Sequence, residues 1–422
     1  MLAFSENYAL TVDGREVSVY HTEAADYAVL CFTGEKDISI QVQKPFSTVS
    51  VRPLRAGHRP TLEDSTIRLR LKHSDRVSVE PYGLKNPLFL LCSERIDKPV
   101  NATHVFASGT VTDIGSMELH SGDCVYLEEG AVVTGGFWAD RAKDICITGN
   151  GIMNGLPLQG AGKKKIKMMR FIECENVSIS GVTIVNSPSW NVVPIACKNV
   201  IIDGINIIGI VMSSDGIDIV GCEDVEVMRC FICVNDDCLV VKANRYDDPR
   251  GCKDAKRIRM HDCVLWKLKC GNAIEIGYET SAEEICEVVF ENLDVIHSEL
   301  EGWQSGGVFT IHNGDRAHVH DILYRDIYIE DAQEKLIDFK ILTSKYSVDK
   351  WRGKISDIVL DGIYVIGDIL PPSIIRGYES DLGEPELIEN IQIRNLTLNG
   401  KPVQGQLNAH AVVELARGVR FE

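Results

Sequence analysis

A nine-residue pattern of alternating apolar and polar positions recurs along most of the chain. Its copies are apolar at positions two, four, seven and nine, and most carry Gly, Asn or Asp at position six. Alternation on either side of a turn residue indicates two short strands that meet at a bend, whereas a helix needs apolar positions three and four apart. The copies begin at Asn176, Asn199, Asp224, Arg257, Glu287, Asp321, Asp357 and Asn390.

A further short apolar strand follows most copies of the pattern. About three strands in every 23 to 36 residues is the period of a right-handed parallel β-helix, in which each coil buries its apolar face against its neighbours. A leucine-rich repeat fits less well, because its LxxLxLxxN spacing does not occur. The additional strands cover residues 217–219, 239–241, 274–276, 309–311 and 337–339.

The first ninety-odd residues follow a different pattern. Short alternating strands separated by turns such as Asp13-Gly14 are typical of a β-sandwich. They cover residues 8–12, 17–20, 28–32, 38–42 and 49–51. The sequence therefore predicts an all-β protein with two domains, a small β-sandwich at residues 1–95 and a β-helical catalytic domain at residues 96–422.

Charge and composition exclude several classes of protein. The 44 basic and 61 acidic residues give a net charge of −17, which would repel nucleic acid and anionic membranes. No apolar run approaches the length of about 18 residues that a membrane span requires. The amino terminus has neither the basic nor the apolar region of a secretory signal, so we expect a cytoplasmic protein. The oligomeric state is left open.

The 14 cysteines fit free thiols better than disulfides in a long chain without an export signal. Two series recur at steps of 23 and 25 residues, which indicates small buried residues stacked one per coil. The series are Cys174, Cys197 and Cys222, and Cys238, Cys263 and Cys286.

Two acidic segments occupy neighbouring coils of the predicted β-helix. They are Ser213-Ser214-Asp215-Gly216-Ile217-Asp218 and Asn235-Asp236-Asp237-Cys238. Alignment of the following strands places Asp215 beside Asp237, and stacked strands lie about 4.8 Å apart. Crowded carboxylates raise the pKa of at least one member, which yields the protonated acid and ionised carboxylate of glycoside hydrolysis. The alternative interpretation is a set of solvated turn residues.

The order of these segments carries a resemblance to a known family. Asn186-Ser187-Pro188 precedes the two acidic segments, each about one coil apart. The chain resembles the glycoside hydrolases of family 28, the polygalacturonases, whose motifs run NSP, NTDGID, DDC, GHG and RIK. It is also similar to family 49, the dextranases and isopullulanases, which place a β-sandwich before the β-helix.

The resemblance implies roles for the carboxylates. Asp236 matches the general acid, and Asp215 and Asp237 match the pair that activates the attacking water. These families invert configuration, so carboxyl groups about 6.5 to 9.5 Å apart are expected. No metal and no other cofactor is implied.

Two departures from the family motifs favour a different sugar. Gly271-Asn272-Ala273 stands where the family has GHG, and residues 307–312 contain neither Arg nor Lys where it has RIK. We therefore expect a neutral α-linked glycan, with dextranase-like glucan hydrolysis favoured and galacturonide hydrolysis as the alternative. Cations for a uronate remain available from Lys242, Lys340 and the 163–167 loop. Predicted sugar contacts are Asn272, Asp218, Glu275, Thr310 and Asp338.

Aromatic and histidine side chains are weaker candidates for substrate contacts. Trp190 and Tyr278 are predicted to line the cleft, with ordinary packing as the alternative for each, and His312 is either a further contact or a surface histidine. Two short motifs could suggest a metal site, a CxxC at Cys230 and Cys233 and an HxH at residues 318–320. On a strand, a step of three residues points to opposite faces, so the CxxC is poorly placed to hold one ion. We therefore expect no metal.

Two functions of other classes remain as alternatives. A β-helix that binds an oligo- or polysaccharide without cleaving it would not need to crowd like charges. A polysaccharide lyase would need calcium and an Arg or Lys base, and none stands beside Asp236 in the sequence.

Overall fold

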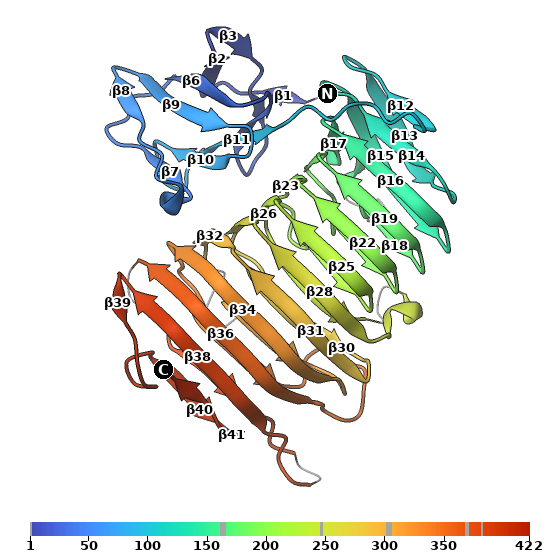
Figure 1. Cartoon of the computed structure of the whole chain (residues 1–422), viewed down its shortest axis with the longest axis vertical. Coiled ribbons are helices and arrows are strands. Elements are labelled where there is room, and N and C mark those ends of the chain that lie inside the picture. Colours follow the sequence, from blue (N-terminus) through green and yellow to red (C-terminus); the bar gives the residue numbers. More distant parts are fainter. Residues whose placement is uncertain (1, 161–165, 245–247, 301–305, 368–370, 381–382) are drawn as a thin grey trace.

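The computed structural model describes residues 2–160, 166–244, 248–300, 306–367, 371–380 and 383–422. A β-sandwich (blue in Figure 1) lies beside a long right-handed parallel β-helix, so the predicted fold class is confirmed. The helices within these residues are single 3-10 turns, and none is long and apolar enough to cross a membrane. They are η1 (Leu54–Ala56), η2 (Leu156–Leu158) and η3 (Pro249–Gly251).

The sandwich consists of two sheets whose apolar faces pack together. Alternating residues such as Ile38, Ile40, Ile67 and Leu69 form the core between the sheets. One sheet is ordered β1 (Ala3–Phe4), β4 (Tyr20–His21), β5 (Asp26–Cys31), β11 (Leu88–Ser93), β10 (Arg76–Glu80) and β7 (Ser50–Arg52). The other is ordered β3 (Arg15–Val17), β2 (Tyr8–Val12), β6 (Glu35–Val42), β9 (Thr66–Lys72) and β8 (Thr61–Glu63).

The β-helix has three parallel ladders, because each coil contributes up to three short strands. The first contains β12 (His104–Phe106), β14 (Cys124–Leu127), β16 (Lys143–Gly149), β19 (Glu175–Ser180), β22 (Lys198–Asp203), β25 (Glu223–Met228), β28 (Ala255–His261), β31 (Glu284–Glu291), β34 (His318–Glu330), β36 (Lys354–Ile366), β38 (Ile388–Leu398), β41 (Ala416–Arg417) and β42 (Arg420–Phe421). The second contains β17 (Ile152–Asn154), β20 (Thr183–Val185), β23 (Asn206–Ile208), β26 (Phe231–Val234), β29 (Val264–Lys267) and β32 (Asp294–Ser298), and continues into β34.

The third ladder carries the predicted carboxylate segments. It contains β13 (Val111–Glu118), β15 (Val132–Asp140), β18 (Met169–Ile172), β21 (Val192–Ile195), β24 (Ile217–Val220), β27 (Leu239–Ala243), β30 (Ile274–Thr280), β33 (Gly307–Asn313), β35 (Lys335–Ile341), β37 (Ser373–Arg376) and β40 (Ala411–Glu414). The short β39 (Lys401–Pro402) pairs antiparallel with β38.

Left-handed backbone turns explain the nine-residue pattern. In all eight copies, positions one and six have φ between 51° and 75°. Gly, Asn and Asp tolerate this conformation better than other residues, which is why they dominate both positions. Position one bends the chain within the first ladder, and position six lies between the first and second ladders. The intervening apolar residues, such as Val177 and Ile179, point into the bore and are buried.

The cysteines stack only in part as predicted. In the first series, the amide of Cys174 donates to Sγ of Cys197 at 3.4 Å, and that of Cys197 donates to Sγ of Cys222 at 3.2 Å. The second predicted series is wrong. Cys263 stacks on Cys230 instead, and the amide of Cys230 donates to Sγ of Cys263 at 3.4 Å. The prediction fails because the coils lengthen here, so equal steps in the sequence no longer reach equivalent positions.

The sandwich packs against the outer face of the second ladder. Phe89 lies at the centre of this contact, with ring centroids 4.8 Å from Phe231 and 5.5 Å from Trp266. Buried ion pairs flank the aromatic cluster. Glu80 of the sandwich contacts both Arg52 at 3.1 Å and His297 of the β-helix at 3.0 Å. The two domains therefore share a core, and the second ladder is covered.

We expect Trp266→Ala to weaken the contact between the domains. The side chain is 1% exposed, and its removal leaves a cavity beside Phe89, so the unfolding free energy should fall by about 3–5 kcal/mol. Thermal unfolding and limited proteolysis within residues 94–103 measure the effect. Trp351→Ala is the matched control, because Trp351 is 59% exposed and should change stability little. Equal proteolysis of both variants would contradict the prediction.

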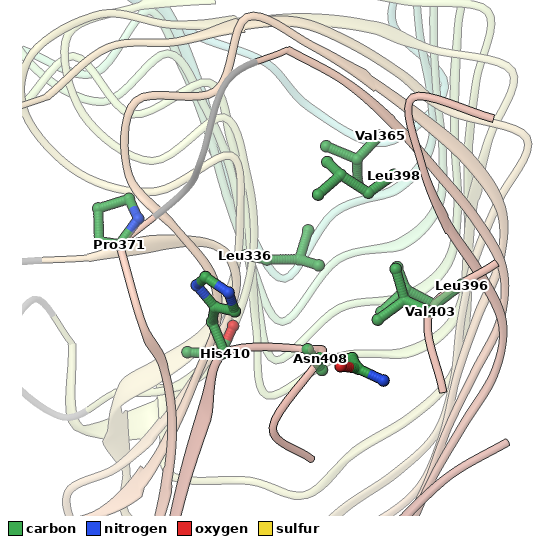
Figure 2. A pocket seen from close by; sticks show the side chains of 10 residues that line it. Leu336, Val365, Pro371, Leu396, Leu398, Val403, Asn408 and His410 are labelled. Carbon is green, nitrogen blue, oxygen red and sulfur yellow. The ribbon is translucent and has the colours of Figure 1, made fainter. Parts of the chain in front are cut away.

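A small apolar cavity lies near the carboxyl-terminal end of the bore (Figure 2). Its volume is about 130 Å³, and most of its walls are aliphatic side chains of the last coils and of the segment that closes them. None of the predicted catalytic carboxylates lines this cavity. The labelled residues are Leu336, Val365, Pro371, Leu396, Leu398, Val403, Asn408 and His410.

Candidate active site

Strand register brings the two acidic segments together at the start of the third ladder. Ile217 of β24 pairs with Leu239 of β27, so the residues two positions earlier, Asp215 and Asp237, lie on adjacent rungs. The amide of Gly216 donates to the carbonyl of Asp237 at 2.8 Å and fixes this register. A side chain at position 216 would meet the backbone oxygen of Cys238 at 2.4 Å, so the close approach of the coils requires glycine here.

A second glycine supports the Asp236-Asp237 turn from the following coil. Gly271 has φ +76°, and an added Cβ would lie 2.3 Å from the carbonyl carbon of Asp236. Only glycine accommodates both the left-handed backbone and this contact. Glycine therefore remains where the family motif has its first glycine, although the following histidine is replaced by Asn272.

Asp215, Asp236 and Asp237 form one cluster, with one oxygen of each within 4.8 Å of the others. Asp215 and Asp237 are almost completely buried, whereas Asp236 is partly exposed. Burial, followed by repulsion from Asp215, raises the pKa of Asp236 to about 7. Burial and the charge of Asp236 also raise the pKa of Asp237. The cluster therefore retains a proton near neutral pH, although its nearest oxygens are closer than the expected 6.5 to 9.5 Å.

Lys242 is the counter-charge of this cluster. Its ammonium lies 3.2 Å from Asp215, 3.1 Å from Asp218 and 4.0 Å from Asp237. Burial opposes its charge, but the surrounding carboxylates outweigh burial and raise the pKa of Lys242. The ammonium of Lys242 is therefore paired with carboxylates of the cluster. It balances their negative charge, in place of the contact with substrate that the sequence predicts.

Asn272 occupies the rung after Asp237 and orients that carboxylate. Its backbone amide and its side-chain Nδ2 each donate to Oδ1 of Asp237 at 2.8 Å. Its side-chain Oδ1 accepts from the amide of Gly307 at 3.1 Å. The residue is 3% exposed, so the structure places it as a support for Asp237.

Glu275, Thr310, His312 and Asp338 form a buried network on the next rungs. Thr310 donates to Glu275, and His312 bridges Glu275 at 3.0 Å and Asp338 at 3.2 Å. Although burial disfavours the imidazolium, Glu275 and Asp338 raise the pKa of His312 to about 9. These buried groups contact one another, and Asp218 lies 3.1 Å from the ammonium of Lys242. They do not present open oxygens to a neutral sugar, so this basis for predicting a glucan is lost.

Cationic side chains gather around Asp338. Lys340 lies 2.8 Å and Lys335 3.5 Å from its carboxylate. Burial opposes the charge of Asp338, but His312 and the two lysines outweigh it and hold its pKa below the usual range. Within the described residues, Nζ of Lys335 has no hydrogen-bond partner. The 163–167 loop offered other cations, but residues 163–165 lie outside the described part of the chain.

Lys335 was missed by the sequence analysis. It continues the column formed by Asp215, Asp237, Asn272 and Gly307, because Gly307 pairs with Lys335. The signal was the same strand alignment that placed Asp215 beside Asp237, extended by three further coils.

The two predicted aromatic contacts flank the cluster and are partly exposed. The ring of Trp190 lies 4.3 Å from Nζ of Lys242 on one side of the carboxylates. On the other side, Tyr278 stacks on His312 with a centroid distance of 4.3 Å and lies 5.9 Å from Tyr346. Both positions suit stacking against sugar rings.

A parallel β-helix with crowded carboxylates, one of them protonated near neutral pH, is the arrangement of the β-helical glycoside hydrolases. The family model of the glycosyl hydrolases of family 28 matches residues 140–366, more than half of the 422 residues. The chain belongs to this family. The matched region includes the whole carboxylate cluster and the His312 network.

The sequence of this chain is similar to those of two kinds of protein named as polygalacturonases. A probable polygalacturonase from Vitis vinifera is 38% identical over 174 residues, covering 37% of this chain and 34% of the relative. A probable exopolygalacturonase B from Aspergillus fumigatus is 22% identical over 259 residues, covering 54% and 53%. The chain thus aligns with about a third to a half of the length of these relatives.

Solved structures share the fold at low sequence identity. Dex49A from Penicillium minioluteum has a TM-score of 0.55 at 13% identity, with 86% of this chain and 89% of that chain covered. An exopolygalacturonase from Thermotoga maritima has a TM-score of 0.55 at 17% identity, with 75% and 84% covered. The expected dextranase-like activity is not supported, because both sequence relatives are named as polygalacturonases.

Proposed function

We propose that this protein hydrolyses α-linked galacturonides by a polygalacturonase-type mechanism. The observation that supports the proposal best is the combination of the Asp215, Asp236 and Asp237 cluster with Lys335 and Lys340, which lie beside Asp338 a few rungs away. The first group suits bond cleavage. The second group suits the carboxylate of a uronate, which cations bind through charge-assisted hydrogen bonds.

Asp236 is the proposed general acid. It is the most exposed of the three carboxylates, and a pKa of about 7 leaves it partly protonated at neutral pH. It donates this proton to the oxygen of the glycosidic bond as the bond breaks. The reaction returns a proton to the cluster when water is deprotonated.

Asp215 and Asp237 are proposed to hold and deprotonate that water. Lys242 contacts both carboxylates, which reduces their nucleophilicity and suits them to bind water rather than to attack the sugar. We therefore propose inversion, as in the resembled families, despite the short spacing of the nearest oxygens. Proton NMR of the first product anomer distinguishes inversion from retention.

A substrate panel tests the proposed activity. Polygalacturonate, dextran and their oligosaccharides are incubated with the full chain, and reducing ends are measured. We expect release from galacturonides and little from dextran. Hydrolysis of dextran with none of galacturonides would overturn the choice of sugar.

Lys335→Met tests recognition of the uronate carboxylate. Loss of a charge-assisted hydrogen bond of about 1.5–3 kcal/mol should raise KM for galacturonides at least about tenfold and change kcat less. Lys401→Met is the matched control, because Lys401 is exposed near the carboxyl terminus. An unchanged KM would remove Lys335 from substrate recognition.

A further inference from the structure

Four side chains with metal-binding donors occupy two consecutive rungs of the first ladder. β31 pairs with β34 so that Glu284 lies opposite His318 and Cys286 lies opposite His320. Residues two apart on a strand point to the same face. The four side chains therefore form a two-by-two grid on the outward-facing side of the first ladder, where Cys286 is buried and the other three are partly exposed. The carboxylate cluster lies on a different ladder.

Three of the donors already converge. One carboxylate oxygen of Glu284, Sγ of Cys286 and a ring nitrogen of His320 all lie within 4.8 Å of one another. Nε2 of His320 is 3.1 Å from the Glu284 carboxylate. The ring of His318 lies beside that of His320, with centroids 4.2 Å apart.

A neighbouring carboxylate orients His320 toward the other donors. Nδ1 of His320 lies 2.8 Å from the carboxylate of Asp321. With a proton on Nδ1 donated to Asp321, Nε2 is the ring nitrogen that would bind an ion on the side of Glu284. Metal-bound histidines are commonly held in this way by a carboxylate on the far nitrogen.

We propose that Glu284, Cys286 and His320 bind a zinc ion, with His318 as the fourth ligand. A thiolate, imidazoles and a carboxylate in fourfold coordination are the ligands that Zn²⁺ prefers. His318 now contacts the hydroxyl of Ser356 at 2.8 Å, and its ring must turn away from that residue to join the site. The ion joins two consecutive coils, so its role is structural and independent of the proposed hydrolysis.

Lys256 is the competing cation. It occupies the rung before Cys286, and its ammonium pairs with Glu284 and, at 3.2 Å, with Asp254. A zinc ion takes over the contact with Glu284, and the ammonium keeps its contact with Asp254. Lys256→Met should therefore strengthen zinc binding rather than weaken it.

Titration of the metal-free full chain with Co²⁺ and Zn²⁺ tests the site. We expect one ion per chain, a sulfur-to-cobalt charge-transfer band in the near ultraviolet, and a melting temperature that rises with zinc. Cys286→Ser should abolish the band, whereas Cys31→Ser, in the sandwich, should preserve it. Asp321→Asn, which suits the left-handed backbone at this position, should weaken binding about 10- to 100-fold.

Further variants distinguish the proposed zinc site from binding elsewhere on the chain. Asp236→Asn should bind the metal as the wild type does, so binding lost in that variant would place the ion in the carboxylate cluster instead. Retention of the charge-transfer band in Cys286→Ser, or no binding of either ion by the folded wild type, would overturn the site. Circular dichroism confirms that each variant is folded, and His320→Gln supplies a second ligand variant if Cys286→Ser is unstable.

Discussion

Asp236→Asn is expected to lower kcat/KM for galacturonides at least about a hundredfold, the lower range for loss of a general acid. Asparagine has nearly the same size but cannot transfer a proton to the leaving oxygen. The hydrogen bond from the amide of Asp237 to the Asp236 side chain, 3.1 Å long, can be kept by the asparagine oxygen. The local fold should therefore survive, and initial rates of reducing-end release measure the loss.

Asp326→Asn is the matched control for this prediction. Asp326 is an exposed turn residue with φ 53°, a conformation that asparagine also adopts. Its replacement should leave kcat/KM within a factor of about two. Equal turnover by wild type and Asp236→Asn would exclude Asp236 as the acid. A wild type that binds galacturonides without cleaving them would support the alternative of a glycan-binding β-helix.

The sequence predicts the coils because their turns favour particular residue types. Every copy of the pattern has left-handed backbone at positions one and six, and Gly, Asn or Asp occupies most of them. Arg229, Arg257 and Glu287 adopt the same conformation without the expected residue type. Those copies were recognised only because their apolar positions stayed in register with the others.

The sequence of the β-helix also indicates which of its faces the sandwich domain covers. Position ten of five consecutive copies is apolar, and it follows an apolar position nine, so the alternation breaks. These residues point outward from the second ladder and are buried under the sandwich or within the shared core. They are Val185, Ile208, Cys233, Trp266 and Ile296. An outward apolar stripe of this kind predicts a covering element.

The candidate site was predictable where strand register alone decides it. Alignment of β24 with β27 placed Asp215 beside Asp237 correctly. Register does not say which polar groups satisfy one another. Glu275, Thr310 and Asp338 were expected to face substrate, but they engage His312 and neighbouring lysines. Such internal pairing depends on side-chain rotamers, which the strand pattern does not contain.

Lys242→Met is expected to shift the pH dependence of hydrolysis to higher pH. Without the ammonium, Asp237 loses the contact at 4.0 Å that favours its ionised form, so its pKa rises further above the usual range. The positive charge also lowers the pKa of Asp236, so its removal raises that pKa above about 7. Both limbs of the kcat/KM profile should therefore move upward.

At neutral pH, the variant should lose about tenfold or more in kcat/KM, because a higher pKa of Asp237 leaves less of the ionised carboxylate that deprotonates water. Its melting temperature should also fall, since removal of one partner from a buried ionic cluster costs about 3–5 kcal/mol. Lys242→Arg keeps the charge and should retain a profile near that of the wild type. A Lys242→Met profile with unchanged limbs would show that the ammonium does not set the protonation of the cluster, even if the variant is less stable.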